Sequence, residues 1–147
     1  MDSVVLDTNV LIDFLSIARP EHNLAIAMVR TLQASAVKVH IVATSLKDIY
    51  YVLSRYDGET VARAAVTTMV AIFTILPVNG DCCRRALACG EPDFEAGIIR
   101  AAAEIARVDY IVSRDTHAFV GSLVPCLSPT QALRELNRRP QGFPNSV

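Results

Sequence analysis

Five acidic residues stand where this sequence changes from an apolar run to a helical pattern. Asp7 ends the run SVVLD, Asp48 follows VKVHIVA, Asp115 follows a short run that contains YIV, and Asp93 and Glu95 open an apolar helical segment. Carboxylates brought to one place repel one another, and a divalent cation that prefers oxygen ligands, Mg²⁺ or Mn²⁺, relieves the repulsion. Because no His or Cys accompanies these acids, the pattern argues against zinc. Acidic sites of this kind typically serve phosphoryl chemistry.

Each acid also has a purely structural interpretation. Asp48, Asp93 and Asp115 each stand where a side chain could cap the first turn of a helix. Asp7 is harder to explain in this way, because an acid that abuts a buried apolar strand needs a partner or a metal. Asp13 is expected to be a solvated helix acid.

These acids can act together only if the fold brings them to one edge. Short apolar runs, which predict strands, alternate with segments of helical spacing. The expected strands are 3–6, 37–43, 73–78, 110–112 and 123–127. Short, nearly all-apolar strands are typical of a parallel sheet covered on both faces, so the fold class is α/β, a three-layer α/β/α sandwich with a central, mainly parallel sheet. Ligands of such sheets bind beyond the carboxyl ends of the strands, where the acids fall.

Composition narrows the setting. Hydrophobic residues make up 52 % of the 147 residues, which suits one domain with a substantial core. The N-terminus, MDSVVLD, lacks the positive region of a signal peptide, and no apolar run reaches the roughly 18 residues of a membrane span, so we expect a cytoplasmic protein. The four cysteines lack zinc spacing and are expected to be reduced and structural. The net charge of −1 means that a nucleic-acid partner would need metal ions or local basic residues.

Three segments carry a family resemblance. In chain order they are SVVLDTNVLIDFL, TSLKDIYYVL and DYIVSRD. Together they resemble the PIN-domain ribonucleases, and in particular the VapC-type toxins of bacterial toxin–antitoxin pairs. The likeness covers residues 3–136. It implies a PIN-like nuclease domain over residues 1–137, with 138–147 a flexible tail, and an endoribonuclease that cuts RNA phosphodiesters by Mg²⁺- or Mn²⁺-activated water.

The resemblance also assigns the acids. Asp7 matches the first, Asp48 the second and Asp115 the fourth member of the family's acidic quartet, which implies that all three are catalytic and bind the metal. The polar residues Thr8 and Asn9, beside the first acid, and Ser113, two residues before the fourth, are implied to support them.

The third acid departs from the family pattern. Family members read like DFEDA or DFEDG at this place, whereas this chain reads DFEAG, so that Ala96 occupies the position of the expected Asp. The substitution could be engineered, it could be natural degeneration, or a neighbour could replace the acid. Asp93 is one helical turn away, whereas Glu95 is rotated by about 100° and is expected to be the poorer substitute. The present form is therefore expected to be impaired; the alternative is a catalytically inactive PIN module that binds RNA or protein.

The family likeness implies several partners. They are an RNA substrate, a cognate antitoxin protein and a second copy in a homodimer, with no membrane. Apolar helices at 9–15 and 45–56, with Tyr50 and Tyr51, could line an antitoxin groove or could be ordinary core packing. Arg114, beside the fourth acid, is the best candidate for contact with phosphate.

Overall fold

The computed structural model of this chain describes residues 1–89 and 93–138. The elements follow in the order β1 Ser3–Leu6, α1 Thr8–Leu15, α2 His22–Ala34, β2 Lys38–Val42, α3 Ala43–Asp57, α4 Glu59–Ile72, β3 Thr74–Leu76, α5 Gly80–Ala88, α6 Phe94–Ala106, β4 Tyr110–Val112, the 3₁₀ helix η1 Thr116–Phe119, β5 Cys126–Leu127 and α7 Pro129–Arg138. This alternation of strands and helices is the α/β pattern that the apolar runs predict.

The sheet is parallel throughout, with the strand order β3-β2-β1-β4-β5. Val4 of β1 pairs with Val39 of β2 on one side and with Tyr110 of β4 on the other. The chain therefore adds strands in one direction from β1 and then reverses, which creates a switch point between β1 and β4. In open parallel sheets, binding sites form at such a point beyond the carboxyl ends of the strands.

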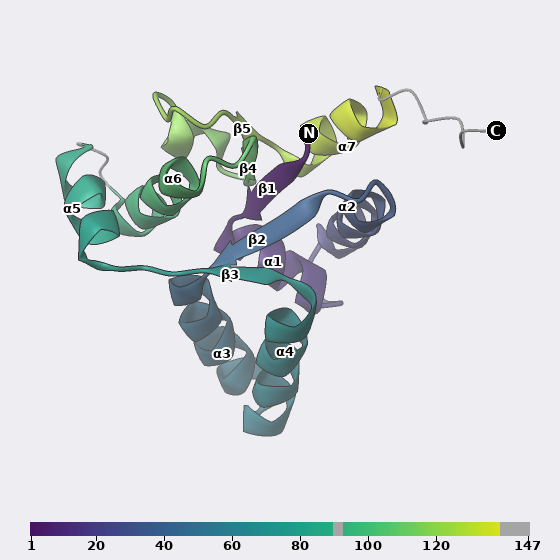
Figure 1. The fold of residues 1–147 in the computed structure, drawn as a ribbon. Coiled ribbons are helices and arrows are strands. Elements are labelled where there is room, and N and C mark those ends of the chain that lie inside the picture. Colours follow the sequence, from purple (N-terminus) through teal and green to yellow (C-terminus); the bar gives the residue numbers. More distant parts are fainter. Residues whose placement is uncertain (90–92, 139–147) are drawn as a thin grey trace.

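Two helical layers cover the sheet (Figure 1). Val4 and Leu6 of β1 belong to a core shared with α1, α2, α3, α4 and α7. Val5, between them, belongs to a second core shared with α5 and α6. Successive side chains of a strand point to opposite faces, so a strand covered on both faces must be apolar at every position. The predicted three-layer α/β/α sandwich is confirmed.

Several local expectations need correction. Strand β2 is two residues shorter than the expected 37–43, and β5 is three shorter than 123–127. The helix α5 begins at Gly80, where the side chain of Asn79 supplies the cap; the sequence suggested Asp81 for this role. The expected flexible tail at 138–147 cannot be described beyond its first residue: Arg138 ends α7, and 139–147 lie outside the described residues.

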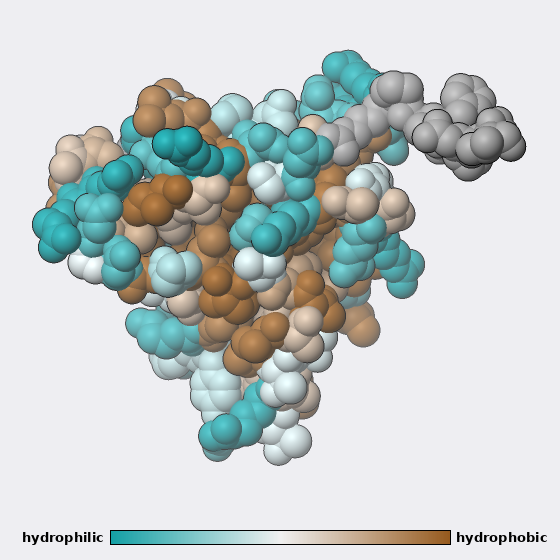
Figure 2. Space-filling view, in the orientation of Figure 1, coloured by the Kyte–Doolittle hydropathy of each residue, from teal (hydrophilic) through white to brown (hydrophobic). Residues whose placement is uncertain are grey.

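The described helices include none with both the length and the apolar character that crossing a membrane requires. Apolar side chains are nevertheless exposed along α4, where Val61, Val70 and Ile72 are each 44–51 % accessible. Figure 2 shows hydrophobic residues gathered on this face over the middle of the molecule. Exposed apolar patches of this kind often mark contact surfaces.

Candidate active site

Asp7 is the single residue between β1 and α1. Its backbone N–H donates to the carbonyl of Val112 at 2.9 Å, next to the β1–β4 ladder. Its Oδ1 accepts a hydrogen bond from the N–H of Thr8 at 2.7 Å, so that the carboxylate caps α1. Only 9 % of Asp7 is exposed. A carboxylate this deeply buried is costly unless its oxygens are satisfied.

Ser113 and Asn9 satisfy the second oxygen of Asp7. The hydroxyl of Ser113 donates to Asp7 Oδ2 at 2.7 Å, and Asn9 Nδ2 lies 3.4 Å from both Asp7 Oδ2 and Ser113 Oγ. The backbone N–H of Asp115 donates to the same hydroxyl at 3.0 Å. This network spans the switch point, since Ser113 follows β4 while Asp7 and Asn9 begin α1. It fixes the orientation of the Asp7 carboxylate.

A second buried contact joins α1 to α3, the helix that carries Asp48. Thr8 Oγ1 and Ser45 Oγ are 2.8 Å apart, and both residues are buried. The sequence pattern of Ser45 and Asp48 suggests a capping box, but none forms, because α3 begins earlier, at Ala43, with no side-chain cap. Ser45 therefore lies within the first turn and is free to face Thr8, and Asp48 falls in the second turn.

The acids surround one pocket at the carboxyl edge of the sheet. It has a volume of about 260 Å³ and is lined by residues of α1, α6 and η1 and of the segments that precede them: Asp7, Thr8, Asn9, Ile12, Asp93, Glu95, Ala96, Asp115 and Ala118. Four carboxyl groups thus share a small space. Asp93 and Asp115 also cap their helices, through bonds from Glu95 N at 3.0 Å and from Ala118 N at 3.3 Å. The structural and the functional interpretations of these two acids are therefore compatible.

Crowding changes the acidity of two of these groups. Burial raises the pKa of Asp7, the charges of Asp115 and Asp93 raise it further, and the hydrogen bonds from Ser113 and Thr8 partly offset the rise. Burial is also the main reason that the pKa of Glu95 rises to about 7; a hydrogen bond with Asp48 and the charges of Asp48, Asp7 and Asp93 add to it. The Glu95–Asp48 interaction brings the second acid, on α3, into the same cluster.

The donor set suits a hard divalent cation by its chemistry. All of the candidate ligands are carboxylate oxygens, which Mg²⁺ and Mn²⁺ prefer, and their mutual repulsion is what a cation would relieve. Within residues 1–89 and 93–138, however, no three Asp, Glu, His or Cys side chains converge closely enough to form a ready-made metal site. Binding would therefore require rotation of side chains around the pocket.

Comparison with known proteins identifies the family. A family model of the PIN domain matches residues 3–117. The chain belongs to the PIN-domain family. No curated protein sequence matches it significantly.

Solved structures show the same PIN fold. The VapC20 toxin of Mycobacterium tuberculosis, which cleaves the sarcin–ricin loop, is 16 % identical, with a TM-score of 0.65 over 82 % of this chain and 96 % of that one. A toxin–antitoxin complex from Klebsiella pneumoniae contains a chain that is 25 % identical, with a TM-score of 0.64 and coverages of 86 % and 97 %. VapBC2 of Rickettsia felis, bound to promoter DNA, contains a chain that is 11 % identical, with a TM-score of 0.66 over 86 % of this chain and 98 % of that one.

Position 96, where the family pattern leads one to expect an acid, belongs both to the core and to the wall of the acidic pocket. Ala96 is 7 % exposed and belongs to the core between the sheet and α6, although it also lines the acidic pocket. Glu95, expected to be a poorer substitute than Asp93, lines the pocket together with Asp93 and also interacts with Asp48. The longer side chain and its place in the first turn of α6, two residues after the cap at Asp93, allow Glu95 to reach across.

One site residue was missed. Asp13 is 2 % exposed, not solvated as expected, and its Oδ2 lies 2.6 Å from the Nε of Arg114. Within residues 1–89 and 93–138, its Oδ1 has no hydrogen-bond partner. Arg114 is thereby held beside Asp115, and its backbone N–H also donates to Asn9 Oδ1 at 3.4 Å. The helical spacing of Asn9 and Asp13, four residues apart, places both on one face of α1 and could have indicated this role.

Other charged and polar side chains, including arginines that a phosphate could contact, have structural partners. Arg85 pairs with Asp81, and Arg100 pairs with Glu104 at 3.0 Å. The hydroxyl of Tyr50 donates to Glu59 at the α3–α4 contact, 2.8 Å away, whereas Tyr51 is 62 % exposed. The cysteines are free, as expected. Burial raises the pKa of the Cys126 thiol to about 12, which favours the protonated form.

Proposed function

We propose that this PIN domain, over residues 1–137, is a metal-dependent endoribonuclease that acts as the toxin of a toxin–antitoxin pair. The observation that carries the proposal is the pocket at the switch point, which Asp7, Asp93, Glu95 and Asp115 line and where Glu95 interacts with Asp48. Family membership and the toxins among the similar structures support it.

In this proposal Asp7, Asp48 and Asp115 hold Mg²⁺ or Mn²⁺. When bound, such a cation would activate the attacking water and stabilise the charge that develops on the phosphate. The polar neighbours of Asp7 orient its carboxylate. The Ser113 hydroxyl and the Thr8 N–H each donate a hydrogen bond to one of its two oxygens, and Asn9 lies beside them. Because these bonds form before substrate arrives, the carboxylate is preorganised and need not be ordered during the reaction.

We further propose that the present form is impaired, because Ala96 contributes no oxygen to the pocket. Glu95 is the neighbour best placed to compensate in part, since its carboxyl group already lies among the other acids. The second candidate function, a PIN module that binds RNA or protein without cutting, rests on the same missing donor at Ala96.

The deciding experiment titrates Mn²⁺ into the protein and into Ala96→Asp by calorimetry, and then measures cleavage of single-stranded RNA by both. We expect Ala96→Asp to bind Mn²⁺ more tightly and to cut at least about tenfold faster, because a metal-bound nucleophile is the main catalytic term. Glu95→Gln in the original background should lower whatever Mn²⁺ affinity remains. Asp7→Asn in the Ala96→Asp background is the inactive control.

The outcomes separate the candidate functions. Unchanged Mn²⁺ affinity and cleavage in Ala96→Asp would show that position 96 is not a vacated ligand site. Binding of RNA with no cleavage in either form, at any Mn²⁺ concentration, would favour the non-cutting module.

Antitoxin binding and homodimerisation complete the proposal. Similar chains occur in complexes with antitoxins, and the exposed apolar residues of α4, Val61, Val70 and Ile72, offer a surface for a second copy. Sedimentation equilibrium of the protein and of Val70→Glu tests the dimer: a dimer that persists unchanged in Val70→Glu does not use this face.

A further inference from the structure

A second pocket lies beside the acidic one, between α1 and α3. It has a volume of about 370 Å³ and is lined by residues of the two helices and of the loop after α1: Ile12, Ser16, Ala18, Arg19, Val52, Leu53, Tyr56 and Asp57. Ile12 belongs to the walls of both pockets. The two spaces therefore adjoin across one side chain.

One face of α3 leads from the acid Asp48 to this second pocket, which Val52 and Tyr56 line. On α3, Asp48, Val52 and Tyr56 are spaced by four residues and form one stripe along the helix. Eight residues of helix span about 12 Å. A polymer joined by phosphodiester bonds, with the phosphate that reacts placed at the acids, would thus run along this stripe and bring its neighbouring monomers to Tyr56.

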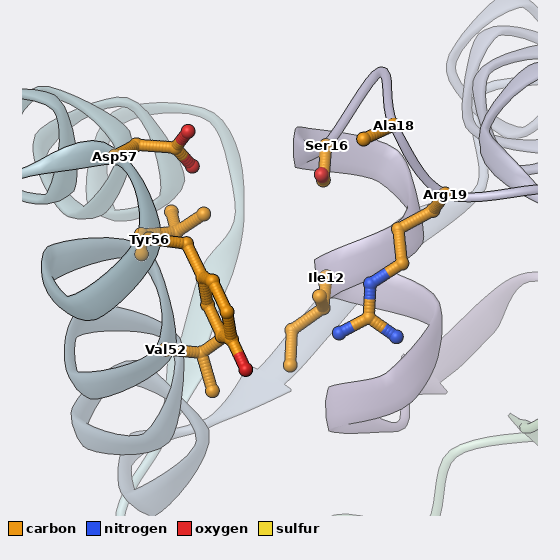
Figure 3. Close-up of a pocket in the computed structure, with 8 residues that line it drawn as sticks. Ile12, Ser16, Ala18, Arg19, Val52, Tyr56 and Asp57 are labelled. Carbon is orange, nitrogen blue, oxygen red and sulfur yellow. The ribbon is translucent and has the colours of Figure 1, made fainter.

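Arg19 and Tyr56 face each other across the pocket. In Figure 3 the guanidinium of Arg19 extends into the space beside Ile12, and the ring of Tyr56 projects into it from α3. Arg19 is half-buried, yet within the described part of the chain no carboxylate pairs with it; Asp57 lies on the opposite rim. The tyrosine is 78 % exposed.

This combination is suited to single-stranded nucleic acid. Proteins bind such strands by stacking bases on aromatic rings and by placing arginine against the backbone phosphates, and the stacking tolerates any base. A partly desolvated guanidinium without a counter-charge favours an anionic ligand. Val52, Leu53 and Ile12 supply apolar contact for the face of a base.

We propose that the pocket between α1 and α3 is a subsite for the substrate strand, in which Tyr56 stacks a base near the scissile phosphate and Arg19 binds a flanking phosphate. The assignment rests on the proposed ribonuclease function and adds the residues that hold the strand. We assign the pocket to RNA rather than to a protein partner for two reasons. The guanidinium of Arg19 has no counter-charge among the described residues, and the adjoining acidic pocket is the proposed site of phosphodiester cleavage, so both favour a polyanion.

The test measures binding separately from cleavage. Fluorescence anisotropy follows a labelled single-stranded RNA with Ca²⁺ in place of Mn²⁺, over a series of salt concentrations. Tyr56→Leu should weaken binding by about 5- to 150-fold, the range for one stacked base, and Tyr56→Phe should restore it. Arg19→Gln should lower the slope of log affinity against log salt by about 0.7, the value for one phosphate on a single strand.

Matched controls come from exposed residues of the same types. Arg30→Gln on α2 removes one exposed charge, and Tyr51→Leu removes an exposed tyrosine from α3 itself. Neither should change the affinity or the salt slope. In Mn²⁺, Tyr56→Leu and Arg19→Gln should raise KM more than they lower kcat, because they bind the strand away from the reacting phosphate.

Each outcome decides. If the Tyr56 and Arg19 variants match their controls while the parent protein still cuts RNA, the subsite is refuted and the ribonuclease stands. If the parent protein neither binds nor cuts RNA, both proposals fail. If the variants keep full RNA affinity but lose binding of a protein partner, the pocket belongs to that partner and the inference is rejected.

Discussion

The pair of Asp13 and Arg114 offers a quantitative test of how the site is held. The perturbation is Arg114→Met, which keeps much of the side-chain volume but removes the charge. Asp13 would then retain a carboxylate that is 2 % exposed, with Oδ1 already unpartnered and Oδ2 newly so. The reciprocal change, Asp13→Asn, removes the buried charge instead.

The two changes should differ in magnitude. Removing one partner of a buried ion pair costs about 3–5 kcal/mol. Since Arg114 is 39 % exposed and the pair is partly screened, we expect about 3 kcal/mol for Arg114→Met. Asp13→Asn leaves an arginine that can turn to water, so the cost is about 1 kcal/mol. The double variant should resemble Asp13→Asn, because the uncompensated carboxylate is gone.

Urea unfolding at pH 7, followed by circular dichroism, measures these free energies, and thermal scans should show Tm lower by about 6–12 °C for Arg114→Met. A double-mutant cycle over the four proteins gives the coupling energy, expected at about 3 kcal/mol because the double variant should cost no more than Asp13→Asn alone. Equal destabilisation by the two single changes, or additive effects in the double variant, would refute the reasoning that Arg114 compensates a buried charge.

Two further predictions concern stability away from the acids. Burial lowers the pKa of His40 from its ordinary value of 6.5, the charge of Lys38 adds to this, and the hydrogen bond to the Val4 carbonyl partly offsets it. As the pH falls, the unfolded chain therefore binds a proton at this histidine before the folded chain does, so the free energy of unfolding should decline below about pH 6.5. Urea unfolding from pH 7.5 to 5 should show a smaller decline in His40→Gln than in the parent protein. An identical decline in the two proteins would contradict this. A Cβ at Gly97 would stand 3.2 Å from Ala86 Cβ and O. Gly97→Val should therefore lower the free energy of unfolding by about 1–3 kcal/mol in the same assay. A cost no larger than that of the exposed control Ala88→Val would mean that α5 and α6 move apart without penalty.

Local sequence was sufficient for the architecture. Apolar runs bounded by helical spacing predict the five strands, and their short, nearly all-apolar composition predicts a sheet covered on both faces. Errors stayed at the ends, as at Ser45, because caps depend on one or two residues whose partners lie elsewhere in the chain. The partner of Ser45 is Thr8, 37 residues away.

The sequence by itself also determined which edge holds the acids. Asp7 and Asp115 follow neighbouring parallel strands, and parallel strands end at a common edge whatever the details of packing. The roles of Asp7, Asp48 and Asp115 as metal ligands remain predictions, as does the impairment by Ala96.

Only the tertiary structure decided how far each side chain reaches. Helix geometry alone made Glu95 the poorer substitute for the missing acid, and its interaction with Asp48 on α3 depends on how α3 and α6 lie in the fold. Asp13 looked like a surface acid until the segment after β4 covered it with Arg114. Both depend on where one helix or loop lies against another, which is set by packing across the whole sheet and leaves no periodic signal in the sequence.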